Sequence, residues 1–277
     1  MLYRRQPPSP PLSAYVEYFW AFEKAEGRPT LEHVLPDGSF ELVINLLEDG
    51  RKRFERDDEQ RFQVLRRGWL SGVQSSYLII DNVPVAEMIG AHFRPGGAAA
   101  FFGGSAADFR NQVIELDAIW GASCVALREQ LIATKGTEAK FGVLESFLGR
   151  LLGRQRQAGS RSRRIAWAVE QFCHQPHVTG IARAADTLGI SHKHFIDQFR
   201  DCVGLTPKVF CRIQRFQRVM GQIQAVRPVD WADVACACGY YDQAHFVHDF
   251  RSFTGLNPTA YLRLECPDSR FLNLGRR

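Results

Sequence analysis

A phrase of fourteen residues occurs twice near the C-terminal end of this chain. HFIDQFRDCVGLTP begins at His194 and HFVHDFRSFTGLNP begins at His245, fifty-one residues later, and seven of the fourteen positions are identical. Upstream of the phrase, three further pairs match: Ala182/Ala232, Ala185/Ala235 and Gly189/Gly239. A repeat of this kind restricts the fold to one that contains the same supersecondary unit twice.

Each copy has the pattern of a short helix, a glycine turn and a second helix. In the first copy, one buried helical face is predicted by apolar residues at i, i+3, i+4 and i+7, namely Ile181, Ala184, Ala185 and Leu188. Gly189 then favours a left-handed turn, Ser191 is placed to cap the second helix, and Gly204 to end it. In the second copy the same roles fall to Gly239, Asp242 and Gly255. Each copy is therefore predicted to be a helix-turn-helix.

The number of copies separates two architectures. A helical solenoid needs about three or more units to bury a continuous core, so two copies favour a pair of DNA-binding modules. We expect a connecting helix over residues 207–221, which at 1.5 Å per residue would span about 22 Å. Such a spacer could place the two second helices near one DNA turn apart, about 34 Å.

The distribution of charge agrees with a polyanionic partner. Residues 160–277 hold 16 Lys and Arg against 10 Asp and Glu, whereas residues 1–159 hold 19 against 20. Six of the eight histidines also lie in the C-terminal part. A basic half next to a neutral one is typical of a nucleic-acid-binding domain, although a solvated basic surface gives the same count.

The phenylalanines of each copy are predicted to face inward, which fixes the outward face of each second helix. The candidate base-contacting residues are His192, Lys193, Ile196, Asp197, Gln243, Ala244, Val247 and His248. Glutamine suits adenine, lysine suits guanine, and valine or isoleucine suits the thymine methyl group. The candidate phosphate-contacting residues are Ser191, Arg200, Arg212, Arg215, Asp242 and Arg251. His194 and His245, in the first helical turn, are interpreted as packing or capping residues.

The C-terminal hundred residues resemble the AraC/XylS family of bacterial transcription regulators, over about 164–263. The resemblance rests on IARAADTLGISHKHFIDQFRDCVGLTPKVFCRIQRFQRV and DVACACGYYDQAHFVHDFRSFTGLNPTAYL, whose G-Y-x-D-x-x-x-F-x-x-x-F-R-x-x-x-G-x-x-P is similar to the family signature. It implies two helix-turn-helix modules in adjacent major grooves of a promoter, with recognition helices at 191–202 and 242–253. Asp197 and Asp249 depart from the family pattern, because they place negative charge on or beside these helices.

The N-terminal half carries strand signals between residues 31 and 93. Segments 40–46, 68–81 and 85–93 are rich in β-forming residues, with a charged break at 50–61 and a turn at Leu35-Pro36-Asp37-Gly38. An amphipathic helix is predicted at 137–153, followed by the polar stretch GRQRQAGSRSR. LPDGSFELVINL and HFRPGGAAAFF more loosely resemble the β-rich effector domains that precede such DNA-binding modules.

These patterns predict an α+β fold class, with an N-terminal β-rich, cupin-like barrel domain carrying helices and an all-α C-terminal domain. The expected boundaries are 1–152 for a sensor or dimerisation domain, 153–163 for a linker and 164–277 for the DNA-binding domain. A connecting helix joins the two helix-turn-helix modules of the latter.

The N-terminal half shows no residue set for catalysis or metal binding. His33 and His92 are its only histidines, and the His spacing of a cupin metal site is missing. Arg94-Pro95-Gly96-Gly97 is interpreted as a β-to-α turn in preference to an anion site. The aromatic residues Trp20, Phe22, Trp69 and Trp120 are interpreted as core in preference to a ligand pocket. No catalytic residue, metal or cofactor is therefore expected, and the cofactor-binding residues of any bound group are unknown.

The sequence predicts a cytoplasmic transcription regulator that is not an enzyme. The expected partner is double-stranded promoter DNA, with RNA polymerase, an unnamed small-molecule effector and a second copy of the chain as further candidates, and no membrane. The seven cysteines are interpreted as small buried hydrophobic residues in a reducing compartment. The alternatives are a cupin-like enzyme or metal-dependent protein with an accessory DNA module, and a helical protein-interaction module without a DNA role.

Overall fold

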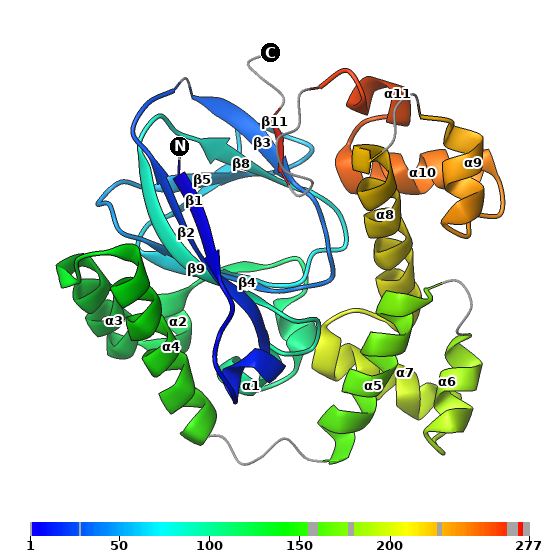
Figure 1. The fold of residues 1–277 in the computed structure, drawn as a ribbon, viewed down its shortest axis with the longest axis horizontal. Helices are drawn as coiled ribbons and strands as arrows, with labels where there is room; N and C mark the ends of the chain where they lie inside the picture. The colour runs from blue at the N-terminus through cyan, green and yellow to red at the C-terminus, as the bar shows by residue number, and fades with distance from the viewer. Residues whose placement is uncertain are drawn as a thin grey trace.

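The computed structural model describes residues 2–27, 29–154, 160–176, 180–225, 229–264 and 271–273. A β-rich half is followed by a helical half, which lies along one side of it (Figure 1). This arrangement confirms the predicted fold class. The described part of the chain contains no helix that is both long and apolar enough to cross a membrane.

The β-rich half is built from two antiparallel sheets. Its strands are β1 (Leu2–Gln6), β2 (Val16–Lys24), β3 (Thr30–Val34), β4 (Glu41–Asn45), β5 (Arg51–Phe54), β6 (Phe62–Leu65), β7 (Gly68–Ser71), β8 (Leu78–Asn82), β9 (Ala86–Phe93), β10 (Val113–Glu115) and β11 (Phe271–Asn273). The order is β1-β2-β9-β4-β7-β10 in the first sheet and β11-β3-β8-β5-β6 in the second. The charged break predicted at 50–61 contains β5 and the turn that leads to β6.

Alternation along β2 shows how the first sheet joins two layers of core. Phe19 and Ala21 belong to the large buried cluster that includes the helices, whereas Trp20 belongs to a smaller cluster. That smaller cluster combines Trp20 and Trp69 of the first sheet with Leu78 of the second, so it lies between the sheets. Successive side chains of a strand point to opposite faces, which produces this division. The prediction of a core role for both tryptophans is confirmed.

Helices of several lengths cover the outer face of the first sheet. They are η1 (Leu12–Ala14), α1 (Ala99–Phe102), η2 (Ala106–Phe109), α2 (Leu116–Trp120), α3 (Ala122–Ala133) and α4 (Thr137–Arg154). The last of these is the predicted amphipathic helix, and Phe141, Leu144 and Leu148 are buried on its inner face. The sequence ArgProGlyGly at 94–97 forms a turn in which the Gly97 N–H donates to the Arg94 carbonyl, as predicted.

The helical half contains both helix-turn-helix modules. Its helices are α5 (Ser160–His174), α6 (Ile181–Thr187), α7 (His192–Val203), α8 (Pro207–Ala225), α9 (Trp231–Ala237), α10 (Gln243–Thr254) and α11 (Pro258–Tyr261). Helix α8 runs between the two modules (Figure 1). It is 19 residues long, not the predicted fifteen, and at 1.5 Å per residue it spans about 28 Å.

Strands β1, β2, β10 and β11, which lie outside residues 31–93, and part of α5 were not predicted. The N-terminal strands β1 and β2 lie before residue 31, and α5 begins at Ser160, four residues earlier than expected. The predicted linker therefore contains the ends of α4 and α5, and its residues 155–159 lie outside the described residues. Strand β11 returns from the C-terminal end to pair with β3 of the N-terminal half, with Leu272 opposite His33. The domain boundaries themselves stay a prediction.

Candidate nucleic-acid interface

The turns and caps of both modules are formed by the predicted residues. The Ser191 hydroxyl accepts the backbone N–H of His194 at 3.3 Å, and the Asp242 carboxylate accepts that of His245 at 2.7 Å. Gly204 and Gly255 end the recognition helices with φ values of +87° and +79°, in the left-handed region that favours glycine. The repeated glycines and caps are thus determinants of local structure.

The repeated phenylalanines form the interior of the modules. Phe195 and Phe199 of α7 and Phe246 and Phe250 of α10 are fully buried. Within each pair the ring centroids lie 5.9 Å and 5.6 Å apart, respectively. Such close aromatic packing fixes the rotation of each helix about its axis, so equivalent positions face outward in both copies.

The predicted base-contacting residues lie on the outward faces of α7 and α10. Six are exposed: His192, Lys193, Asp197, Gln243, Ala244 and His248. Ile196 and Val247 are half-buried, and Val247 packs against the core. Arg200 and Arg251 are exposed in the last turn of their helices. The two faces together present a surface that mixes hydrogen-bonding groups, small apolar groups and positive charge.

Asp249 does not place a charge on the outward face of α10, which corrects the sequence interpretation. It is 1 % exposed, and its carboxylate accepts the Arg212 guanidinium at 2.6 Å and 3.1 Å. His245 Nε2 lies 3.8 Å from the same carboxylate. A buried carboxylate needs a partner, and this ion pair supplies it by holding Arg212 of α8 against α10.

Arg215 is also engaged within the domain. Its guanidinium lies 5.2 Å from the centre of the Tyr240 ring and donates to the Gly239 carbonyl at 3.4 Å. Burial raises the pKa of the Tyr240 hydroxyl further above physiological pH, where tyrosine is already neutral. The guanidinium groups of Arg212 and Arg215 thus hold α8 against the second module, and the phosphate role predicted for them gains no support.

Both recognition helices end against one loop of the N-terminal half, which the sequence did not reveal. In the segment 72–77, between β7 and β8, Val73 Cγ1 would lie 2.6 Å from a Cβ atom added at Gly204. The Ser76 hydroxyl donates to the Ser252 carbonyl at 2.6 Å, and the Tyr77 ring would lie 3.0 Å from a Cβ atom added at Gly255. One short loop therefore contacts the C-terminal ends of α7 and α10.

The connecting helix α8 rests on the turn that follows β3. Gln217 donates to the Pro36 carbonyl at 2.7 Å, and Gln214 donates to the Asp37 carbonyl at 2.8 Å. Gly38, with φ +91°, lies so close to Phe210 that an added Cβ would be 2.7 Å from its ring. His33 of β3 contacts the Thr254 carbonyl of α10 through Nδ1 at 2.9 Å.

His92, which was considered from the sequence as a metal ligand, lies in a cluster of carboxylates. Its Nδ1 is 2.6 Å from Glu41, and its Nε2 is 3.5 Å from Asp37 and 3.8 Å from Glu17. The imidazole ring also stacks on Tyr18, with ring centres 4.9 Å apart. Among the described residues no group of three or more His, Cys, Asp or Glu is placed to hold a metal ion. The cluster links the 36–38 turn, which supports α8, to β9.

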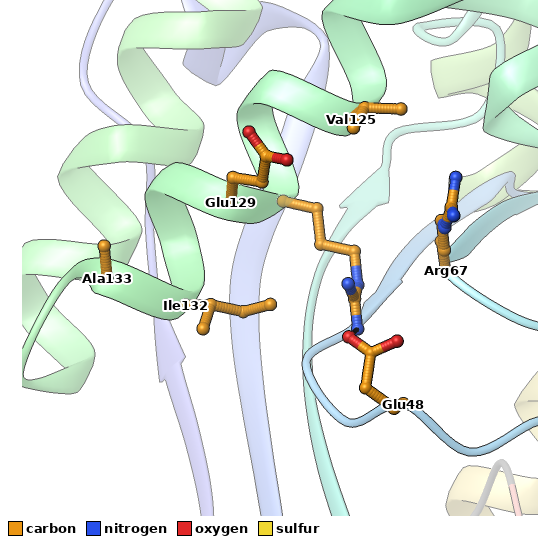
Figure 2. A pocket seen from close by; sticks show the side chains of 7 residues that line it. Glu48, Arg67, Val125, Glu129, Ile132 and Ala133 are labelled. Atoms are coloured by element: carbon orange, nitrogen blue, oxygen red, sulfur yellow. Dashed lines mark hydrogen bonds and ion pairs between the residues drawn. The ribbon is translucent and has the colours of Figure 1, made fainter.

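A pocket of about 400 Å³ opens on the N-terminal half beside α3. Figure 2 shows Val125, Glu129 and Ile132 on α3, with Glu48 and Arg67 across from this helix. Arg128, which also lines it, donates to the carbonyls of Asn45 and Leu47 and to Glu48. These contacts tie α3 to the end of β4, and the mixed charges of the lining favour no particular ligand.

The cysteines differ from the sequence interpretation in one respect. Cys124, Cys211 and Cys238 are buried, but Cys173 and Cys202 are half-buried and Cys236 is exposed. Burial raises the pKa of the Cys211 thiol to about 12 and that of Cys173 to about 11, so both thiols stay protonated and unreactive at neutral pH. Cys266 lies outside the described residues.

Two sequence families match parts of this chain. Residues 184–264 match a family described as a helix-turn-helix domain. Residues 4–115 match a domain of unknown function, DUF6597. Among curated proteins, none matches the chain.

Solved structures give a more distant likeness. Apo ToxT from Vibrio cholerae is 10 % identical with a TM-score of 0.44, over 88 % of this chain and 97 % of that one. A second structure of ToxT from Vibrio cholerae is 8 % identical with a TM-score of 0.45, over 95 % and 98 % of the two chains. A DNA-binding transcriptional dual regulator from Escherichia coli K-12 is 24 % identical with a TM-score of 0.31, over 40 % of this chain and 95 % of that one.

Proposed function

Because the C-terminal domain is an AraC-type helix-turn-helix domain, we propose that this chain is a DNA-binding transcription regulator that contacts two adjacent major grooves of a promoter. One observation carries the proposal. Most positions that are identical in the two copies are buried or shape the backbone, whereas the exposed positions of α7 and α10, apart from the shared histidine (His194/His245) and arginine (Arg200/Arg251), differ between the copies. Two helices of the same build with different surfaces are suited to two different base sequences.

The exposed side chains supply the chemistry for base recognition. In the first module, His192 and Lys193 offer donors to guanine, and Ile196 offers an apolar edge to a thymine methyl group. In the second, Gln243 has the paired donor and acceptor that adenine requires, and Ala244 and Val247 suit a thymine methyl. Asp197 and His248 complete the two surfaces.

Affinity for the phosphate backbone is assigned to the exposed arginines. Arg200 and Arg251 occupy equivalent positions and are free of the buried contacts that engage Arg212 and Arg215. Ser191 keeps a hydroxyl hydrogen that it can donate to a phosphate while its oxygen caps α7. Asp242 is left out, because a carboxylate only accepts hydrogen bonds and repels phosphate.

Selection from a random duplex library with the purified full chain tests this function. We expect enrichment of a bipartite site whose two conserved blocks are about 10 base pairs apart, centre to centre. Binding should weaken steeply as salt rises, because phosphate contacts release counterions. No enrichment, together with salt-insensitive binding, would rule out the proposal and favour a helical protein-interaction module.

We further propose that the N-terminal half controls the relative placement of the two recognition helices. The argument is the loop 72–77, which contacts the ends of both α7 and α10, together with the 36–38 turn beneath α8. A ligand or second copy that shifted either segment would reposition the modules. The identity of an effector, and contacts with RNA polymerase, stay predictions from the sequence.

This control has a direct test in the variant Gln214→Ala/Gln217→Ala, which removes two hydrogen bonds between α8 and the turn. We expect faster amide exchange in both modules and in β3 of the full chain, since the restraint on all of them is shared. Lys208→Ala, on the exposed side of α8, is the matched control. Faster exchange in the second module alone would show that the turn does not restrain both.

A further inference from the structure

The turn of the second module is one residue longer than the turn of the first. In the first, one residue, Ile190, separates Gly189 from the cap Ser191; in the second, two residues separate Gly239 from the cap Asp242. The backbone identifies which residue is additional. Ile190 N–H donates to the Ala185 carbonyl at 3.2 Å, and Tyr240 N–H donates to the equivalent Ala235 carbonyl at 3.0 Å. Tyr240 therefore corresponds to Ile190, and Tyr241 is the inserted residue.

Tyr241 differs sharply from its neighbour in exposure. Tyr240 is 7 % exposed and packs against Phe246 with ring centres 5.4 Å apart. Tyr241 is 94 % exposed, whereas the other exposed large apolar residues among those described range from 37 % to 52 %. A side chain so exposed contributes almost nothing to the buried core, so folding does not account for an aromatic residue here.

The position of Tyr241 places it at the edge of the proposed DNA surface. It directly precedes Asp242, the cap of α10, and the exposed Gln243 and Ala244 follow. Residues at the N-terminal end of a recognition helix lie deepest in the major groove, and the preceding turn passes beside the phosphates that border it. Tyrosine offers such a phosphate a hydroxyl donor on a rigid, uncharged side chain.

We propose that Tyr241 donates a hydrogen bond to a backbone phosphate at the half-site bound by the second module. The inference rests on the proposed function, because it requires α10 to enter a major groove. The first module lacks an equivalent residue, so this contact strengthens only one side of the bipartite complex. It raises affinity without selecting a base sequence, since phosphates carry no sequence information.

The variant Tyr241→Phe tests the proposal, since it removes only the hydroxyl from a residue that the fold does not need. We expect binding to a selected duplex to weaken about tenfold or more, as for loss of a hydrogen bond to a charged group. The slope of log K against log salt should stay unchanged, because a neutral donor releases no counterion. Arg251→Ala should instead flatten that slope, and Phe62→Ala, an exposed aromatic of the N-terminal half, should change neither quantity.

Three outcomes separate this inference from the function on which it rests. Wild-type binding with no loss in Tyr241→Phe overturns the phosphate contact and leaves the proposed function intact. A loss confined to duplexes with one particular base pair overturns it in favour of a base contact. Absence of salt-sensitive duplex binding by the wild-type chain defeats the proposed function itself, and the inference falls with it.

Discussion

The two helix-turn-helix modules carry different polar residues, with different contacts, at one equivalent buried position. In the first module Gln198 is 6 % exposed and its Nε2 lies 2.6 Å from His194 Nε2, while its Oε1 has no hydrogen-bond partner among the described residues. In the second, Asp249 is paired with Arg212 of α8 and faces His245. Equivalent histidines, each one helical turn earlier, thus contact a neutral amide in the first copy and an ion-paired carboxylate in the second.

This difference shows that the modules are attached to the connecting helix unequally. Three contacts join α8 to the second module. They are the Arg212–Asp249 ion pair and the placement of the Arg215 and Arg212 guanidinium groups over the rings of Tyr240 and Phe253, respectively. Arg212 and Arg215 of α8 therefore serve the structure of one module, whereas the exposed Arg200 and Arg251 are the arginines proposed to contact phosphate. A count of basic residues in the sequence cannot separate these two uses.

The largest effect is expected from Asp249→Ala. Its removal leaves the Arg212 guanidinium without its partner, and breaking such a pair costs about 3–5 kcal/mol of unfolding free energy. Gln198→Ala, the matched change in the first module, should cost only about 1–3 kcal/mol. Urea denaturation followed by circular dichroism measures both. Equal losses would contradict the unequal attachment of the modules.

The glycines that end the recognition helices should rank next. Alanine at a positive φ lowers the free energy of unfolding by about 1–2 kcal/mol. Gly189→Ala measures that backbone strain alone, because nothing lies within 4 Å of the added Cβ. Gly204→Ala should cost about 1–2 kcal/mol more than this control, since its Cβ would also meet the Ala106 carbonyl at 2.9 Å.

Gly255→Ala should fall between the other two variants. Its nearest contacts, at 3.0–3.1 Å, are the rings of Tyr77 and His33, which can shift. Thermal unfolding of the three variants gives the order of stability. If Gly204→Ala and Gly189→Ala proved equally stable, the close contact of α7 with the N-terminal half would be excluded.

The smallest effects concern the exposed arginines and the salt dependence of binding. Arg200→Ala and Arg251→Ala should each reduce the slope of log K against log salt by about 0.9, one phosphate contact apiece. Arg61→Ala, whose side chain is exposed in the N-terminal half, is the control and should leave the slope unchanged. Fluorescence anisotropy over a salt series measures the slopes. A change for only one arginine would show that one of the modules does not lie on the backbone as proposed.

The repeat made the C-terminal fold predictable residue by residue. Local backbone preferences and helical spacing can both be recognised in a sequence. They determine the glycine turns, the caps Ser191 and Asp242 and the inward phenylalanines. The outward faces followed from them. Strands β2 and β11 were not predicted, the latter because a three-residue strand leaves little pattern.

The contacts between the two halves could not be predicted in the same way. Asp249 is buried only because α8 supplies Arg212 thirty-seven residues away, and no local pattern marks such a pair. The sequence predicted Gly204 only as the end of a helix, but its lack of a side chain also allows Val73 to pack closely against it. The exposure of Tyr241 likewise depends on how the turn packs, which required the structure.

Base-resolved selection with Lys193→Ala and Gln243→Ala tests most directly whether the two modules contact different half-sites. Each variant should lose its preference at one base pair, by about 1–3 kcal/mol, and the two affected base pairs should lie in different blocks of the bipartite site. Loss of preference at the same base pair, or uniform weakening across all sequences in both variants, would contradict the account.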